Sequence, residues 1–140
     1  MSFLKKAVKQ AISAKTGIIF IVEDNAMYAK TLEAAIKSDF PEVKQIKIFP
    51  VGETCLLDLH KNPDLIIIDY FLDSKYEDAE TGLEIIKQIR AIKPELKIVV
   101  LSGQSDIEVV VEAVKKYDCH YVKKDDEAFS KVAEIIRGMN

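Results

Sequence analysis

The sequence predicts an α/β domain in which a parallel sheet is wrapped by helices. Short apolar segments recur along the chain at residues 18–22, 46–49, 65–70, 97–101 and 120–123. The runs 18–22 and 65–68 are unbroken and rich in β-branched residues, which is typical of strands buried on both faces of a sheet. Amphipathic segments of helical periodicity separate them. Strands that alternate with helices in this way favour a parallel sheet.

Length and composition set limits on this domain. The chain has 140 residues and a net charge of −3, so we expect one domain and no general nucleic-acid-binding surface. Cys55 and Cys119 lack Cys-x-x-Cys spacing and are interpreted as reduced thiols. The sequence contains neither an apolar run of membrane-spanning length nor a signal peptide. We therefore expect a soluble, cytoplasmic protein without a membrane span.

Residues 1–16 form a basic leader before the domain, which we place at 17–140. Leu4, Val8, Ala11 and Ile12 repeat at helical spacing among four lysines. The segment is interpreted first as a partly ordered leader or a short packing helix. Contact with a partner or with an anionic membrane surface stays open as an alternative.

The helices follow from apolar stripes and their stop signals. Asn25 can cap a helix whose stripe is ended by Pro41, and Met27, Leu32 and Ile36 belong to that stripe. A helix at 53–60 is predicted to turn Leu56, Leu57 and Leu59 inward. Further helices are predicted at 83–93, from a capping box at 105–108 onward, and at 126–137. The segment 73–80 is acidic and aperiodic, so it is predicted to be an exposed loop.

Polar side chains follow the predicted strands at their carboxyl ends. They are Glu23 and Asp24, Asp69, Ser102 and Lys124. All carboxyl ends of a parallel sheet lie at one edge, where open α/β sheets bind ligands. Crowded carboxylates repel unless a cation offsets them, and an oxygen-only donor set favours Mg²⁺. A lysine and a hydroxyl beside such an ion suit a phosphoryl group.

Taken together, these residues resemble the receiver domain of two-component response regulators. The resemblance rests on five features in this order: Glu23-Asp24, Asp69 with Leu72, Gly82, Ser102-Gly103, and Tyr121-x-x-Lys124. It implies a doubly wound, flavodoxin-like fold, in which five parallel strands lie in the order 2-1-3-4-5 with helices on both faces. It also implies a signalling protein rather than an enzyme, with self-catalysed phosphoryl acceptance and slow autodephosphorylation only.

The resemblance also implies a role for each residue. Asp69 matches the phosphoacceptor, Asp24 a direct Mg²⁺ ligand, Glu23 its water-mediated partner, and the backbone carbonyl of Phe71 a third protein ligand. Lys124 and Ser102 would bind phosphoryl oxygens, and Ser102 and Tyr121 would act as the switch.

The partners implied are a histidine kinase or a histidine phosphotransfer protein as donor, and a downstream protein target. The target would bind one surface of the domain, which consists of the helix from 105, the strand 120–123 and the helix 126–137. These are the fourth helix, the fifth strand and the fifth helix counted from Gly17. The resemblance leaves a homodimer open and implies no direct DNA binding.

Two other functions stay open. A pseudo-receiver would bind partners without being phosphorylated, although the complete acidic pocket argues against it. A Mg²⁺-dependent phosphatase is a weaker alternative, because Asp69 is not followed by the Asp-x-Asp spacing of aspartate-nucleophile phosphatases.

The chain departs from the family pattern in three respects: the residue after Leu72, the length and acidity of the loop that follows, and the residue after Lys124. Asp73 stands where the family usually has proline, in a longer and more acidic loop, and Asp125 replaces the proline that usually follows the lysine. Phe71, two residues beyond the phosphoacceptor, is predicted to slow dephosphorylation by shielding the phosphoryl group.

Overall fold

The computed structural model describes residues 17–70, 81–103 and 107–139. The predictions for the leader at 1–16, the acidic loop at 73–80, Phe71 and the capping box at 105–108 lie wholly or partly outside these residues. None of the described helices is long and apolar enough to span a membrane.

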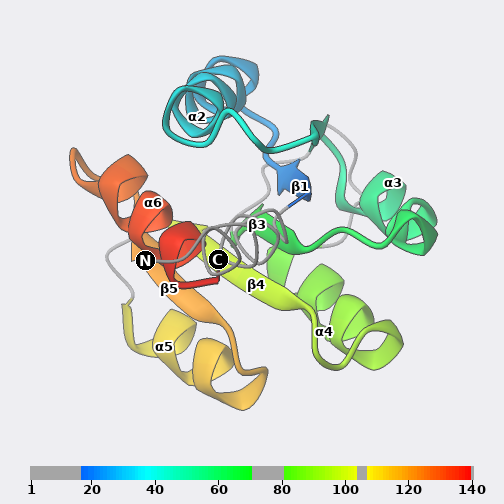
Figure 1. The fold of residues 1–140 in the computed structure, drawn as a ribbon. Coiled ribbons are helices and arrows are strands. Elements are labelled where there is room, and N and C mark those ends of the chain that lie inside the picture. The colour runs from blue at the N-terminus through cyan, green and yellow to red at the C-terminus, as the bar shows by residue number, and fades with distance from the viewer. Residues whose placement is uncertain (1–16, 71–80, 104–106, 140) are drawn as a thin grey trace, which may run out of the picture.

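Five parallel strands form one sheet. They are β1 (Ile18–Val22), β2 (Gln45–Phe49), β3 (Leu65–Asp69), β4 (Lys97–Ser102) and β5 (His120–Lys123), in the order β2-β1-β3-β4-β5. Figure 1 shows β3 in the middle of the sheet, between β1 and β4. The predicted fold class and strand order are confirmed.

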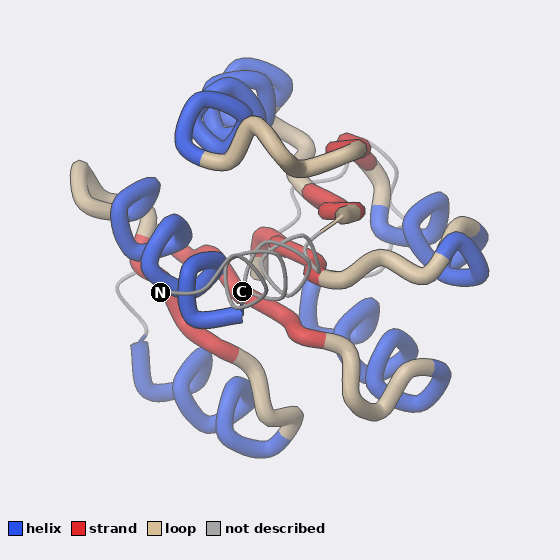
Figure 2. Tube along the Cα trace, viewed as in Figure 1, coloured by secondary structure: helices blue, strands red, loops and turns tan. Residues whose placement is uncertain are grey.

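Helices cover both faces of the sheet, as Figure 2 shows. On one face lie α2 (Ala26–Asp39) and α6 (Ala128–Met139), which pack against alternate strand residues such as Ile21, Ile67 and Leu101. On the other face lie α3 (Gly52–Leu57), α4 (Gly82–Ile92) and α5 (Ile107–Lys116), which pack against the intervening residues such as Phe20, Ile66 and Val100. Because successive strand side chains point to opposite faces, an uninterrupted apolar run supplies both cores.

Two side chains predicted to face inward are exposed. Met27 and Leu57 are 80% and 75% exposed, whereas Ala29 and Cys55 are fully buried. Each exposed residue lies two positions from the buried one, a rotation of about 200° around a helix. Helix α3 also ends at Leu57, and a short 3₁₀ turn at Leu59–Lys61 buries Leu59 instead.

The strand register sets the site edge. Val22 pairs with Ile68, so the acidic residues that follow β1 stand beside Asp69 at the end of β3. Ser102 pairs with Lys123, and the backbone N–H of Lys124 donates to the carbonyl of Ser102 at 2.9 Å. The carboxyl ends of β1, β3, β4 and β5 therefore meet, as the sequence predicted.

Candidate functional site

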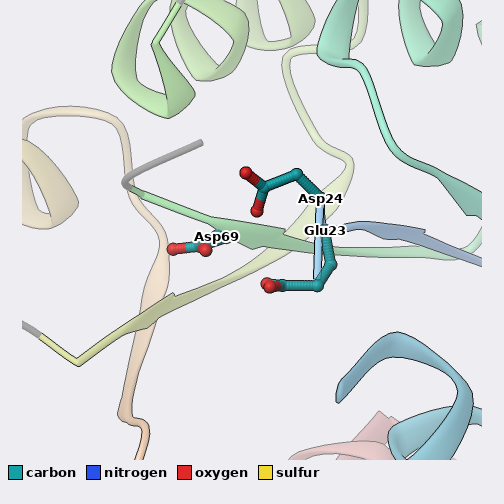
Figure 3. Close-up of side chains that lie close together, drawn as sticks. All are labelled: Glu23, Asp24 and Asp69. Atoms are coloured by element: carbon teal, nitrogen blue, oxygen red, sulfur yellow. The ribbon is translucent and has the colours of Figure 1, made fainter. Parts of the chain in front are cut away.

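Three carboxylates converge at the carboxyl edge of the sheet. One oxygen from each of Glu23, Asp24 and Asp69 lies within 4.8 Å of the others. Figure 3 shows Glu23 and Asp24 leaving the end of β1 and Asp69 leaving the end of β3. Glu23 and Asp69 are buried, at 1% and 6% exposure, while Asp24 is half-buried. Two of the three negative charges are therefore largely removed from bulk water.

Lys124 supplies the positive charge. Its Nζ donates to both oxygens of Glu23, at 3.1 and 2.9 Å, and to Oδ2 of Asp69 at 3.0 Å. The lysine side chain is itself only 19% exposed. Burial alone would lower the pKa of Lys124, but its hydrogen bonds to Glu23 and the charge of Asp69 raise that pKa on balance. The ammonium is therefore charged at neutral pH.

Glu23 is the most perturbed acid of the group. Its pKa is raised to about 7, chiefly by burial and also by the charge of Asp69, while Lys124 offsets part of the effect. One lysine therefore does not neutralise the negative charge of the three carboxylates, and a further cation would stabilise the cluster.

The donor set fits a hard divalent ion. Three closely spaced carboxylates offer oxygen ligands, and the cluster itself contains no histidine or cysteine that would favour a softer metal. Asp24 is the most accessible of the three acids, because it is half-buried and the other two are buried.

Glycine is required at position 82. A Cβ atom placed there would lie 2.4 Å from the carbonyl oxygen of Asp69 and 2.5 Å from that of Tyr70. The N–H of Gly82 donates to the Tyr70 carbonyl at 3.2 Å. The start of α4 thus packs directly on the backbone that carries Asp69, which explains a glycine that the sequence marked only by resemblance.

Ser102 and Tyr121 lie on β4 and β5, beside the strands that carry the acids. Ser102 is fully buried at the end of β4. Tyr121 pairs with Val100, two residues before that end, and is half-buried. Within the described residues its hydroxyl is buried without a hydrogen-bond partner. The structure therefore brings together Glu23, Asp24, Asp69 and Lys124, with Ser102 on the adjacent strand end, whereas Phe71 is outside the described residues.

Tyr28 belongs to the site but was not singled out from the sequence. The Nζ of Lys124 lies 4.5 Å from the centroid of its ring. The sequence feature that pointed to this position was the helix cap at Asn25. A helix that is capped directly after Asp24 places its first turn beside the end of β1. The sequence showed the cap but not the direction of the ring.

Comparisons with known proteins identify the family of the chain. The family model described as "Response regulator receiver domain" matches residues 19–136. The chain is 33% identical over 81 residues to the uncharacterized transcriptional regulatory protein YesN of Bacillus subtilis, a match that covers 56% of this chain and 21% of YesN. It is 26% identical over 124 residues to the cell cycle transcriptional regulator CtrA of Caulobacter vibrioides, covering 85% of this chain and 50% of CtrA.

A solved structure shows the same fold. The isolated receiver domain of RcsB from Salmonella enterica serovar Typhimurium, determined in the presence of the phosphomimetic BeF3⁻, superimposes with a TM-score of 0.73 at 18% identity. The match covers 89% of this chain and 90% of the RcsB domain. The chain spans from about a fifth to a half of the length of the curated relatives named above. It belongs to the receiver-domain family of two-component response regulators.

Proposed function

We propose that this receiver domain accepts a phosphoryl group on Asp69 in a Mg²⁺-dependent reaction, with a histidine kinase or a histidine phosphotransfer protein as donor. The observation that carries the proposal is the contact between Lys124 Nζ and Asp69 Oδ2 at 3.0 Å, inside a cluster of three carboxylates. A nucleophilic carboxylate beside a fixed cation suits attack on an anionic phosphoryl group.

Asp69 is the best nucleophile of the three acids. Both oxygens of Glu23 already accept hydrogen bonds from Lys124, and one also accepts from the N–H of Asn25 at 3.3 Å. Asp24 lies at the more accessible side, where a metal ligand is needed. Asp69 ends the central strand of the sheet, and Gly82 packs against its backbone, so its carboxylate is carried by a fully buried strand with α4 against it.

Phosphoryl transfer to Asp69 forms one bond and breaks another. An Asp69 oxygen forms a bond to phosphorus while the phosphorus–nitrogen bond of the donor phosphohistidine breaks, and the electron pair leaves with the imidazole. Lys124 is placed to pair with one phosphoryl oxygen, and Ser102 would donate a hydrogen bond to a second phosphoryl oxygen. Glu23, Asp24, Asp69 and the backbone carbonyl of Phe71 are the proposed holders of Mg²⁺, which would neutralise charge on the phosphoryl oxygens.

Signal output is assigned to the surface of α5, β5 and α6. Lys124 directly follows β5, so a change in its pairing acts on the strand that carries Tyr121. We propose that phosphorylation shifts the population of two conformations of this surface and thereby its affinity for a downstream protein. The relatives named above are transcriptional regulators, and the expectation of no direct DNA binding is not confirmed.

The test uses acetyl phosphate with Mg²⁺ and intact-mass measurement. The proposal predicts a gain of one phosphoryl group in the unaltered protein, none in Asp69→Asn, and strongly reduced gain in Asp24→Asn or without Mg²⁺. Absence of both modification and metal binding would indicate a pseudo-receiver, and steady turnover of a phosphoester would indicate a phosphatase.

A further inference from the structure

The contacts around Lys124 include a ring that the family pattern does not assign. Lys124 Nζ lies 4.5 Å from the centroid of Tyr28, the shortest of the four contacts between a cation and an aromatic ring in the described part of the chain. The face of an aromatic ring attracts a cation, and the attraction grows when both groups are withdrawn from water. Here the Lys124 side chain is 19% exposed and Tyr28 is half-buried.

Tyr28 is fixed by the same loop that carries the acids. The side-chain oxygen of Asn25 accepts from the N–H of Tyr28 at 3.0 Å, and the N–H of Asn25 donates to Oε1 of Glu23 at 3.3 Å. That oxygen also accepts from Lys124 at 3.1 Å. These contacts therefore form a closed network that connects Glu23, Asn25, Tyr28 and Lys124. Through this network the start of α2 sets the position of the Lys124 ammonium.

A second aromatic residue holds the ring from α6. The rings of Tyr28 and Phe129 lie 5.6 Å apart at an interplanar angle of 67°, an edge-to-face arrangement. Because α2 and α6 cover the same face of the sheet, the Tyr28 ring is fixed between Lys124 and the helix that follows it.

The ring rather than the hydroxyl makes these contacts. Within the described residues the Tyr28 hydroxyl is buried and has no hydrogen-bond partner. Burial raises the pKa of Tyr28, with Lys124 offsetting part of the effect, so the hydroxyl stays neutral at physiological pH. Replacement by phenylalanine should therefore preserve the function of the side chain.

We infer that Tyr28 is a positioning residue for Lys124: its ring holds the ammonium between Glu23 and Asp69, where a phosphoryl oxygen would bind. The inference rests on the proposed phosphoacceptor function. It predicts that a variant without the ring binds the phosphoryl mimic more weakly because Lys124 is less confined.

The experiment compares Tyr28→Leu, Tyr28→Phe and the control Tyr117→Leu. The control removes a ring that lies 5.7 Å from Lys116, in the segment before the amino end of β5, whereas Lys124 follows the carboxyl end of that strand. Beryllofluoride with Mg²⁺ is titrated into each protein. We expect binding to be roughly threefold to tenfold weaker in Tyr28→Leu and unchanged in Tyr28→Phe and Tyr117→Leu.

A spectroscopic readout reports the contact itself. The ring current of Tyr28 should move the ε-methylene proton resonances of Lys124 upfield of those of other lysines, in the unaltered protein and in Tyr28→Phe but not in Tyr28→Leu. Should Tyr28→Leu unfold, Tyr28→Met carries the same expectations.

Three results would overturn the inference. One is wild-type affinity in Tyr28→Leu, another is an equal loss in Tyr28→Phe, and the third is a Lys124 resonance that no Tyr28 variant moves. If the unaltered protein itself bound no beryllofluoride, the proposed function would fail first and the inference with it.

Discussion

The ammonium of Lys124 lies 3.0 Å from a carboxylate oxygen of Asp69, across 55 residues of sequence. Burial leaves the side chain of Asp69 only 9% exposed. Each group therefore depends on the other for stability as well as for chemistry.

Lys124→Met should lower both phosphorylation and stability. The change leaves Asp69 and Glu23 without their shared cation, so we expect the free energy of unfolding to fall by about 2 kcal/mol. Phosphorylation by acetyl phosphate should slow by more than about tenfold. Urea denaturation and intact-mass kinetics measure the two effects.

The control is Lys131→Met. Lys131 pairs with Glu127 on the exposed side of α6 at 3.6 Å, and such a pair contributes at most about 0.5 kcal/mol. A loss in Lys131→Met equal to that in Lys124→Met would contradict the role assigned to the buried cation.

Gly82→Ala should displace the backbone that carries Asp69. Its Cβ would meet two backbone carbonyl oxygens that cannot rotate away, so we expect destabilisation of about 1–3 kcal/mol and slower phosphorylation. Gly138→Ala in α6 is the matched control, because its Cβ meets no atom within 4 Å beyond its chain neighbours and the backbone of its own helix. Helix propensity predicts a neutral or slightly stabilising effect there. Equal thermal unfolding temperatures for the two variants would refute the close-packing argument.

Met27→Gln should separate protein donors from small-molecule donors. Met27 is 80% exposed and lies in the first turn of α2, three residues beyond Asp24. We propose that a donor protein contacts this turn when it brings its phosphohistidine to Asp69. We expect slower transfer from a phosphorylated histidine phosphotransfer protein and an unchanged rate from acetyl phosphate. Leu57→Gln, equally exposed at the far end of α3, should change neither rate. Slower reaction of Met27→Gln with acetyl phosphate would argue against a docking role.

The thiol of Cys55 should report global unfolding. It is fully buried on the core side of α3, and burial raises its pKa to about 12. A thiol-specific reagent at pH 8 should therefore label Cys55 only as fast as the protein opens, and mild denaturant should accelerate the reaction. Rapid labelling of native protein, followed by peptide mapping, would contradict this environment.

The same pKa shift predicts alkaline destabilisation. The unfolded chain releases the Cys55 proton near pH 8.5–9, whereas the folded protein retains it up to about pH 12. The stabilising contribution is therefore fully present below pH 8.5 and is lost as the pH rises toward 12. Cys55→Ala should remove this part of the pH dependence in denaturation curves.

The sequence predicted the sheet well because its strands are buried on both faces. The unbroken runs that end at Val22 and Ile68 identify strands, and the parallel arrangement alone places the acids and Lys124 at one edge. The contact between Tyr28 and Lys124 could not be predicted, because it depends on how α2 is rotated against the sheet. The rotation of α2 also explains the wrong prediction for Met27, and the rotation of α3 explains the one for Leu57. Apolar spacing gives the period of a helix, whereas tertiary packing decides which side of a broad stripe is buried.

The most direct test of the central claim locates the phosphoryl group on the chain. Borohydride reduces an acyl phosphate to an alcohol, so protein treated with acetyl phosphate and Mg²⁺, reduced and digested, carries the change at one residue of its peptide map. We predict the change at Asp69, dependent on Mg²⁺ and absent from Asp69→Asn. Reduction at Glu23 or Asp24, or no reduced residue in protein that binds Mg²⁺, would contradict the account.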